Sequence, residues 1–246
     1  MKMKKYCLIT TSFCKNCSEP SKEQLKNKFN YDGDLSDIYV NFSNEFSPYE
    51  TENIPNVGIT KRRDLVYGKI FLLRQFIENN ILNKYEYLCH IDYSDTKFKR
   101  SFLEMMKDIE TKEIEFIIST EKNAWPYFEN IQTWVDYPLK NEDFIYLNSG
   151  GVISKTEKFY NLLIELEKIC LEKTIDFWDD QGVWQYYDLK VQSLNKDYTS
   201  EYFFSTALLD DTYYSMNENN IQTKFGTYPY LIHDNSSFSL NLINRF

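Results

Sequence analysis

The sequence predicts an α/β fold in which helices flank a mixed, mainly parallel central sheet. Short apolar runs typical of buried strands alternate with longer segments whose apolar residues recur at helical spacing. The clearest run covers residues 85–91, and the most secure helical pattern covers residues 61–79, with a further strongly amphipathic helix over residues 156–171. With 246 residues the chain is long enough for one large α/β core, so we expect a single domain over residues 1–246.

The composition excludes several classes of protein. Hydrophobic residues make up 42% and charged residues 26% of the chain, which is ordinary for a folded globular protein. The net charge of −9 argues against a nucleic-acid partner, because no basic face is evident to meet phosphates. No apolar run is long enough for a transmembrane segment or a signal peptide, and the five irregularly spaced cysteines fit a reducing compartment. We therefore expect a cytoplasmic protein.

The first predicted strand, residues 6–9, is followed directly by Thr10 and Thr11. Hydroxyls at such a strand end often contact the base or ribose in nucleotide-binding α/β folds, although a plain polar loop is an equal alternative. A second apolar segment, residues 38–40, predicts another strand. Residues 61–79 predict a helix with Thr60 as its N-cap. Lys69 lies within it, either as a solvated lysine or as a cation aimed at a phosphate.

A Cys-x-x-Cys motif, Cys14 to Cys17, follows the first strand. It is consistent with a thioredoxin-like redox pair or with half of a zinc site. The redox interpretation needs a helix that starts at the motif, and Ser18-Glu19-Pro20-Ser21 delays one. The zinc interpretation lacks a second cysteine or histidine pair.

The strand over residues 85–91 ends in Asp92, and Asp95 follows three positions later. Ligands of open α/β sheets bind just outside the carboxyl ends of the strands. Two carboxylates there form a hard oxygen site suited to Mn²⁺ or Mg²⁺, which commonly takes substrate phosphates as further ligands. The alternative is that both aspartates only cap a turn and the next helix.

The second half of the chain offers further polar residues beside predicted elements. A helix is predicted over residues 98–109 and strands over residues 115–119 and 144–153, and a long loop over residues 121–142 is either a lid or a surface excursion. The strand at 144–153 is interrupted by small residues, which often mark the close approach of a ligand. The polar candidates are Asn148, Ser149 and Gly150 in that strand, Asp179, Asp180 and Gln181 at the start of a later helix, and His233 and Asn235 at the end of a short strand.

Four of these pieces together resemble a known family. They are Ile91-Asp92-Tyr93-Ser94-Asp95, Leu147-Asn148-Ser149-Gly150-Gly151, Asp179-Asp180-Gln181 and Ile232-His233-Asp234-Asn235. In order and spacing they resemble the GT-A glycosyltransferases related to the glycosyltransferase domain of procollagen lysyl hydroxylases, over nearly the whole chain. The resemblance implies a GT-A fold, which is a Rossmann-like fold of nucleotide-diphospho-sugar transferases.

The resemblance also implies roles for particular residues. Asp92, Asp95 and His233 match the ligands of a Mn²⁺ ion that holds the diphosphate of a UDP-sugar. Lys69 matches a lysine that precedes the acidic motif. The residues matched to binding of the nucleotide sugar are Asn148, Ser149 and Gly150, and the residues matched to the transferred sugar are Asp179, Asp180 and Gln181. Thr10, Thr11, Tyr93 and Asn235 complete the candidate donor site.

Two departures from the family pattern stand out. The family more often has its aromatic ring directly before the second aspartate, whereas here Tyr93 lies one position earlier. The family's histidine motif usually continues with glycine, whereas here Asp234 follows His233. An extra carboxylate at that position would either tighten ion binding or disturb the diphosphate.

The expected function is therefore metal-dependent transfer of a hexose, from UDP-glucose or UDP-galactose, to a glycan, lipid-linked or protein acceptor. By resemblance we expect retention of anomeric configuration. The alternatives are a catalytically inactive nucleotide-sugar-binding module of the same fold, a redox protein built on Cys14 and Cys17, and a nucleotide-sugar hydrolase.

Overall fold

A five-stranded mixed sheet forms the centre of the protein, with the strand order β2-β1-β5-β8-β7. The computed structural model describes residues 3–14, 16–44, 51–53, 60–62, 67–122, 144–172, 180–206, 209, 212–217 and 220–234. The central strands are β1 (Lys4–Phe13), β2 (Ile38–Ser43), β5 (Tyr85–Asp92), β7 (Phe116–Glu121) and β8 (Tyr146–Lys155). Only β8 runs against the other four, so the sheet is mixed and mainly parallel, as predicted.

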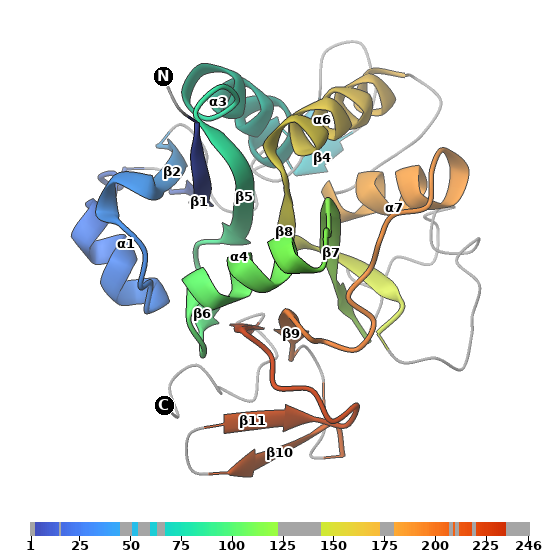
Figure 1. Ribbon diagram of the computed structural model, residues 1–246. Helices are drawn as coiled ribbons and strands as arrows, with labels where there is room; N and C mark the ends of the chain where they lie inside the picture. The colour runs from blue at the N-terminus through green and yellow to red at the C-terminus, as the bar shows by residue number, and fades with distance from the viewer. Residues whose placement is uncertain are drawn as a thin grey trace.

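A second, smaller sheet lies beside the first and has the order β6-β12-β9. Strand β12 (Leu231–His233) pairs antiparallel with β6 (Thr96–Phe98) and parallel with β9 (Phe203–Ser205). Two hairpins complete the described strands: β3 (Thr51–Asn53) with β4 (Thr60–Arg62), and β10 (Tyr214–Asn217) with β11 (Asn220–Thr223). The β10–β11 hairpin projects at the bottom of Figure 1.

Helices cover both faces of the central sheet (Figure 1). The helical elements are α1 (Lys22–Phe29), η1 (Leu35–Asp37), η2 (Tyr67–Leu72), α3 (Leu73–Asn80), α4 (Phe102–Thr111), α6 (Thr156–Leu171) and α7 (Asp180–Lys190). Consecutive strand residues face opposite sides, so Cys7 and Ile9 pack with η2, α3, α6 and α7, whereas Leu8 packs with α1 and α4. The continuous apolar runs in the sequence are therefore the mark of strands buried on both faces.

Two predicted helices have different bounds in the structure. Thr60 begins strand β4 and is not an N-cap, and among the described residues of this segment the helical structure begins at Tyr67. The first turns, Tyr67–Leu72, form a π-helix, an irregularity found mostly at functional sites. The helix predicted to start at residue 98 starts at Phe102, because the Ser101 hydroxyl accepts a hydrogen bond from the Glu104 amide and caps it. The prediction over 156–171 is confirmed.

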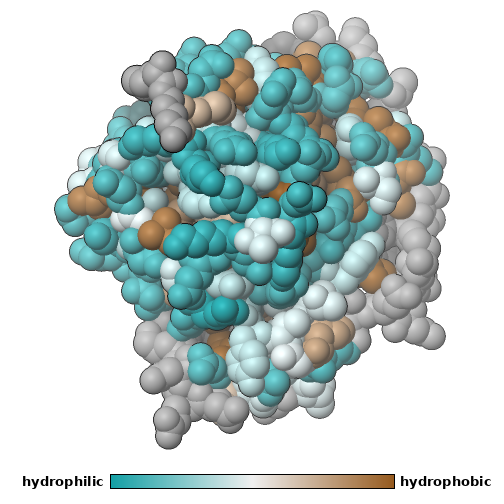
Figure 2. Space-filling model, viewed as in Figure 1, coloured by the Kyte–Doolittle hydropathy of each residue, from teal (hydrophilic) through white to brown (hydrophobic). Residues whose placement is uncertain are grey.

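One face of the molecule is mostly polar. The face shown in Figure 2 is largely hydrophilic, with hydrophobic residues in small, separate groups. Among the described helices, none combines the length and the apolar character that crossing a membrane requires.

Candidate metal and nucleotide-sugar site

Pairing of β12 with β6 brings together two acidic residues and a histidine that lie far apart in the sequence. Asp92 is the last residue of β5, and Asp95 stands in the turn before β6. In the β6–β12 ladder His233 is the register partner of Thr96, the residue after Asp95. The Asp234 amide donates to the Asp95 carbonyl over 2.7 Å and fixes the same alignment. The strand-end positions predicted from the sequence therefore meet at one edge of the fold.

Asp92, Asp95 and His233, hereafter the triad, form a compact group of possible metal ligands. One ligand atom from each residue lies within 4.8 Å of the others. His233 Nε2 is 3.2 Å from Asp95 Oδ1 and 3.8 Å from Asp92 Oδ2. The His233 side chain is only 5% exposed, whereas the two carboxylates are partly accessible. Among the described residues, the triad is the one group in which three or more acidic, histidine or cysteine side chains come this close together.

Gly150 packs closely against two residues of the triad, His233 and Asp92. A Cβ atom on Gly150 would lie 2.3 Å from His233 Cε1, 2.8 Å from Asp92 Oδ2 and 2.9 Å from Asn148 Oδ1. The pairing of β8 with β7 jumps from Val152 to Asn148 at this point, so the small residues between them leave the ladder as a bulge. The interrupted strand predicted from the sequence is thus one strand with a bulge, and the bulge lies against the triad.

Lys69 and Asp180 extend the site on the side of η2 and α7. Lys69 Nζ lies 2.7 Å from Asp92 Oδ1 and 3.8 Å from Asp180 Oδ2. Asp180 is the first residue of α7 and is buried. The π-helical turn that carries Lys69 is held by the Asn41 amide, which donates to the Gly68 carbonyl over 3.2 Å, and by close contact between Gly68 and the Phe13 ring. Lys69 is therefore a buried lysine paired with carboxylates and not a solvated one, and its contact with a phosphate stays a prediction.

Burial and charge oppose each other within the site. Burial lowers the pKa of Lys69, but the carboxylates of Asp180 and Asp92 outweigh it and raise the pKa. Burial raises the pKa of Asp95, but the charges of His233 and Lys69 hold it well below its usual range. Burial lowers the pKa of His233, and the carboxylates of Asp95 and Asp92 raise it above its ordinary value. The charges of His233 and Lys69 thus favour the ionised form of Asp95, which is the form that binds a cation.

A buried acid that sequence reasoning missed lies next to this group. Glu121 is the last residue of β7 and is 1% exposed. Its Oε2 accepts a hydrogen bond from Asn148 Nδ2 over 3.1 Å, and its Oε1 accepts one from Gln181 Nε2. The available signal was its position, because Glu121 ends the strand that begins with the apolar run Phe116-Ile117-Ile118, as Asp92 ends the strand over residues 85–92.

Thr10 and Thr11 occupy a different setting from the one predicted. Strand β1 continues to Phe13, so both residues lie within the strand and not at its end. The Thr10 hydroxyl donates to the Ile91 carbonyl over 2.9 Å, and Thr11 Oγ1 shares a hydrogen bond of 2.9 Å with His90 Nε2. The predicted strand end was therefore wrong, and the nucleotide-binding role of these residues stays a prediction.

Tyr93 lies between the two aspartates in the sequence, and its ring already packs against Lys28 and Phe29. Lys28 Nζ is 4.7 Å from the ring centroid, and the Phe29 ring meets it edge-on at 6.1 Å. The Lys28 ammonium also donates to the Ser94 carbonyl over 3.3 Å. Stacking of a base on Tyr93 would have to use the remaining exposed part of the ring.

Of the remaining predicted site residues, some lie within the described part of the chain and some lie outside it. Ser149 is buried in the β8 bulge next to Gly150. Asp234 stands where the family usually has glycine, and its carboxylate accepts a hydrogen bond from the Thr206 hydroxyl over 2.7 Å. Asp234 does not belong to the group of possible metal ligands. Asp179 and Asn235 lie outside the described residues, as do residues 123–142 of the loop predicted over residues 121–142.

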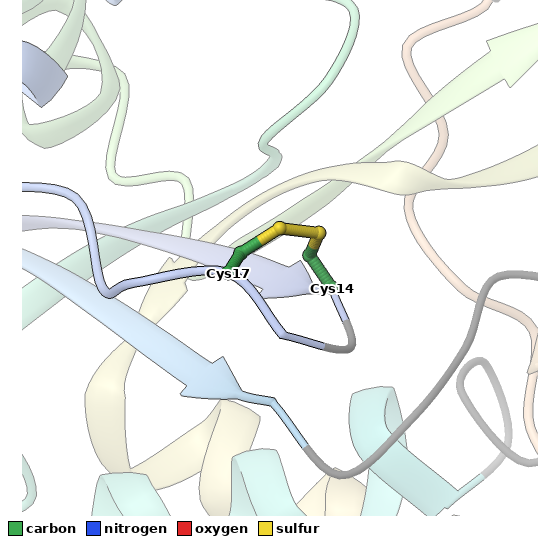
Figure 3. Close-up of a disulfide and its surroundings, with 2 residues drawn as sticks. All are labelled: Cys14 and Cys17. Atoms are coloured by element: carbon green, nitrogen blue, oxygen red, sulfur yellow. A yellow bond between two sulfur atoms is a disulfide. The ribbon is translucent and has the colours of Figure 1, made fainter.

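Cys14 and Cys17 form a disulfide in the loop after β1 (Figure 3). Helix α1 begins only at Lys22, with Ser21 as its N-cap, so no helix starts at the motif as the thioredoxin-like interpretation requires. The remaining cysteines are reduced and buried. The pair is thus a local cross-link of a surface loop.

The triad fits a hard divalent cation. Two carboxylates and one imidazole are a common ligand set for such ions, and Gly150 packs so closely against His233 and Asp92 that any side chain there would displace them. The residues that would hold the ion are Asp92, Asp95 and His233.

No protein-family model matches the sequence, and no curated protein sequence matches it. Among solved structures, the apo form of mouse xyloside xylosyltransferase 1 aligns with 96% of this chain and 99% of its own, at 12% identity and a TM-score of 0.52. A glycosyltransferase involved in glycosylation of the major capsid of PBCV-1 aligns with 97% of this chain and 98% of its own, at 12% identity and a TM-score of 0.48. The first likeness confirms the predicted fold class: this chain has the α/β fold of GT-A glycosyltransferases.

Proposed function

We propose that the protein is a metal-dependent glycosyltransferase that transfers a hexose from a UDP-sugar, with UDP-glucose or UDP-galactose as the leading donors. One observation carries the proposal: the triad converges within 4.8 Å at the strand-end edge of a GT-A fold. The expected order of motifs along the chain supports the same conclusion. The finer relation to the lysyl hydroxylase glycosyltransferase domains, and a single catalytic domain over residues 1–246, belong to this proposal.

Departure of UDP from the sugar is the step that the site has to assist. A bound Mn²⁺ or Mg²⁺ ion supplies neutralisation of the negative charge that develops on the diphosphate. Asp92, Asp95 and His233 hold that ion in the proposal. Lys69 provides a second positive charge next to the same carboxylates, 2.7 Å from Asp92 Oδ1. The two cationic groups would therefore act on the same leaving group.

The sugar end of the donor is assigned to the side of α7 and β8. Asp180 and Gln181 begin α7, Asn148 is the last paired residue before the bulge in β8, and Ser149 and Gly150 lie in that bulge. The Asp180 carboxylate is the candidate for stabilising positive charge on the anomeric carbon or orienting the acceptor. Asp179, Thr10, Thr11, Tyr93 and Asn235 remain candidates for donor contacts, and retention of configuration is proposed by resemblance.

The experiment is release of UDP from a panel of UDP-sugars, in Mn²⁺ and in EDTA. Wild type is compared with Asp95→Ala and with a control, Asp108→Ala, which removes an acid on α4 that pairs with Lys112. The proposal expects release that favours one sugar, requires the metal, and disappears in Asp95→Ala but not in the control. UDP binding without release from any donor would favour an inactive binding module or a strict need for the acceptor. No UDP binding in Mn²⁺ would overturn the proposal.

A further inference from the structure

Glu121 is a buried carboxylate that joins three elements of the proposed donor site. It stands at the end of β7, Asn148 lies on β8, and Gln181 lies in the first turn of α7. All three side chains are nearly inaccessible, at 1%, 2% and 6% exposure. A buried carboxylate is stable only when hydrogen-bond donors satisfy it, and here each of its oxygens accepts from one amide.

The carboxylate determines which way round both amides stand. An ionised carboxylate only accepts hydrogen bonds, so it selects the NH₂ end of Asn148 and of Gln181. At Asn148 the opposite end is fixed as well, because its Oδ1 accepts from the Gly150 amide over 2.8 Å. If the Asn148 amide were turned over, its oxygen would face the Glu121 carboxylate and its NH₂ group would face the Gly150 N–H, so both hydrogen bonds would be lost. The Asn148 side chain is thereby held in one orientation.

The same carboxylate anchors the start of α7. Gln181 directly follows Asp180, and Asp180 Oδ2 lies 3.8 Å from Lys69 Nζ. The hydrogen bond from Gln181 to Glu121 therefore sets the position of the first turn of α7 relative to the sheet. A shift of that turn would move the Asp180 carboxylate away from Lys69 and from the triad.

We infer that Glu121 is a positioning residue of the active site, which fixes Asn148, Gln181 and the α7 turn that carries Asp180. This inference rests on the proposed function for its catalytic consequence. Its structural part, the hydrogen-bond polarity of the three side chains, is testable without any turnover.

The first test is Glu121→Gln, a substitution that keeps the shape of the side chain. A glutamine offers one oxygen and one NH₂, so one of the two amides must face another donor and lose its hydrogen bond. Loss of a supporting contact of this kind typically lowers activity by about 10- to 100-fold. We expect the kcat for UDP release to fall at least about tenfold, while the KM for the donor and the affinity for UDP with Mn²⁺ change less than about threefold. Glu115→Gln, an exposed acid just before β7 that pairs with lysines, is the control.

The second test exchanges the partners. Gln181→Glu alone sets two carboxylates against each other and is expected to lower the melting temperature. In the double variant Glu121→Gln/Gln181→Glu, the new glutamine accepts from Asn148 and donates to the new glutamate. The double variant should therefore melt above Gln181→Glu alone, because contacting residues with matched donors and acceptors show coupled effects.

The outcomes distinguish a failure of the role inferred for Glu121 from a failure of the proposed function. The inference would be overturned if the double variant changed the melting temperature by the sum of the changes in the two single variants. An unchanged kcat in Glu121→Gln would overturn it as well. Absence of UDP binding by the wild type would overturn the proposed function, and the exchange experiment would still decide whether Glu121 positions the two amides.

Discussion

Replacement of Gly150 by alanine tests the architecture of the site with one methyl group. The added Cβ would lie 2.3 Å from His233 Cε1 and 2.8 Å from Asp92 Oδ2. Carbon atoms in contact are separated by about 3.5 Å or more, so the imidazole or the β8 bulge must move by about 1.2 Å. Metal–ligand distances tolerate deviations of only about 0.2 Å. The displacement therefore exceeds what a metal site accommodates without rearrangement.

We expect Gly150→Ala to lower the affinity for Mn²⁺ in the presence of UDP by at least about tenfold, the range seen when the support of a metal ligand is lost. Overpacking should also destabilise the fold by about 1–3 kcal/mol. Calorimetric titration with Mn²⁺ measures the first effect and denaturant unfolding the second.

Gly151→Ala is the matched control for this substitution. Its Cβ would meet the Phe203 ring at 2.7 Å and Ser119 Cβ at 3.1 Å, and no triad residue is among its nearest neighbours. It should destabilise the fold comparably and bind Mn²⁺ nearly as wild type does. Wild-type affinity in Gly150→Ala, or an equal loss in Gly151→Ala, would refute the reasoning.

Three further predictions address other parts of the molecule. Lys69→Met should lower the affinity for UDP in the presence of Mn²⁺ by about tenfold, because a charged contact to the diphosphate is lost. It should not weaken the binding of Mn²⁺ alone, because Lys69 competes with a cation for Asp92 Oδ1. Calorimetry with and without UDP measures both affinities, and weaker binding of Mn²⁺ alone would contradict the prediction. Burial raises the pKa of Asp197 to about 6, so the folded state binds this proton more tightly than the unfolded state. The resulting stability is complete below pH ~4 and decreases by about 3 kcal/mol as pH rises through 6, a slope that urea unfolding should detect and that Asp197→Asn should lack. Cys14→Ser/Cys17→Ser should leave UDP release within about twofold of wild type, since the disulfide links a loop outside the triad, and loss of release would revive the redox alternative.

The sequence was sufficient for the parts of the site that follow from strand ends. Asp92 and His233 each directly follow an apolar run, and each is the last residue of its strand in the structure. Their meeting, however, depends on the pairing of β12 with β6, elements separated by more than half the chain, and no local pattern encodes that contact. The resemblance to a family, and not periodicity, brought these residues together before the structure did.

The errors have physical causes in tertiary structure. The apolar spacing over residues 61–79 is helical, yet Thr60–Arg62 pairs with β3, and the helix starts later as a π-helical turn packed under Phe13. Glu121 was overlooked because a glutamate after a strand usually reaches solvent, and only the convergence of Asn148 and Gln181 shows that it is buried and satisfied. Local preference thus indicated the elements, and packing decided their bounds and partners.

The most direct test of the central claim is a crystal of the protein grown with Mn²⁺ and UDP, with anomalous diffraction used to locate the metal. The account predicts a manganese peak bound by Asp92, Asp95 and His233 at about 2.0–2.2 Å, with diphosphate oxygens completing the coordination. It also predicts that Lys69 contacts the diphosphate. A bound UDP whose metal lies away from these three residues, or no metal at the triad at saturating Mn²⁺, would contradict it.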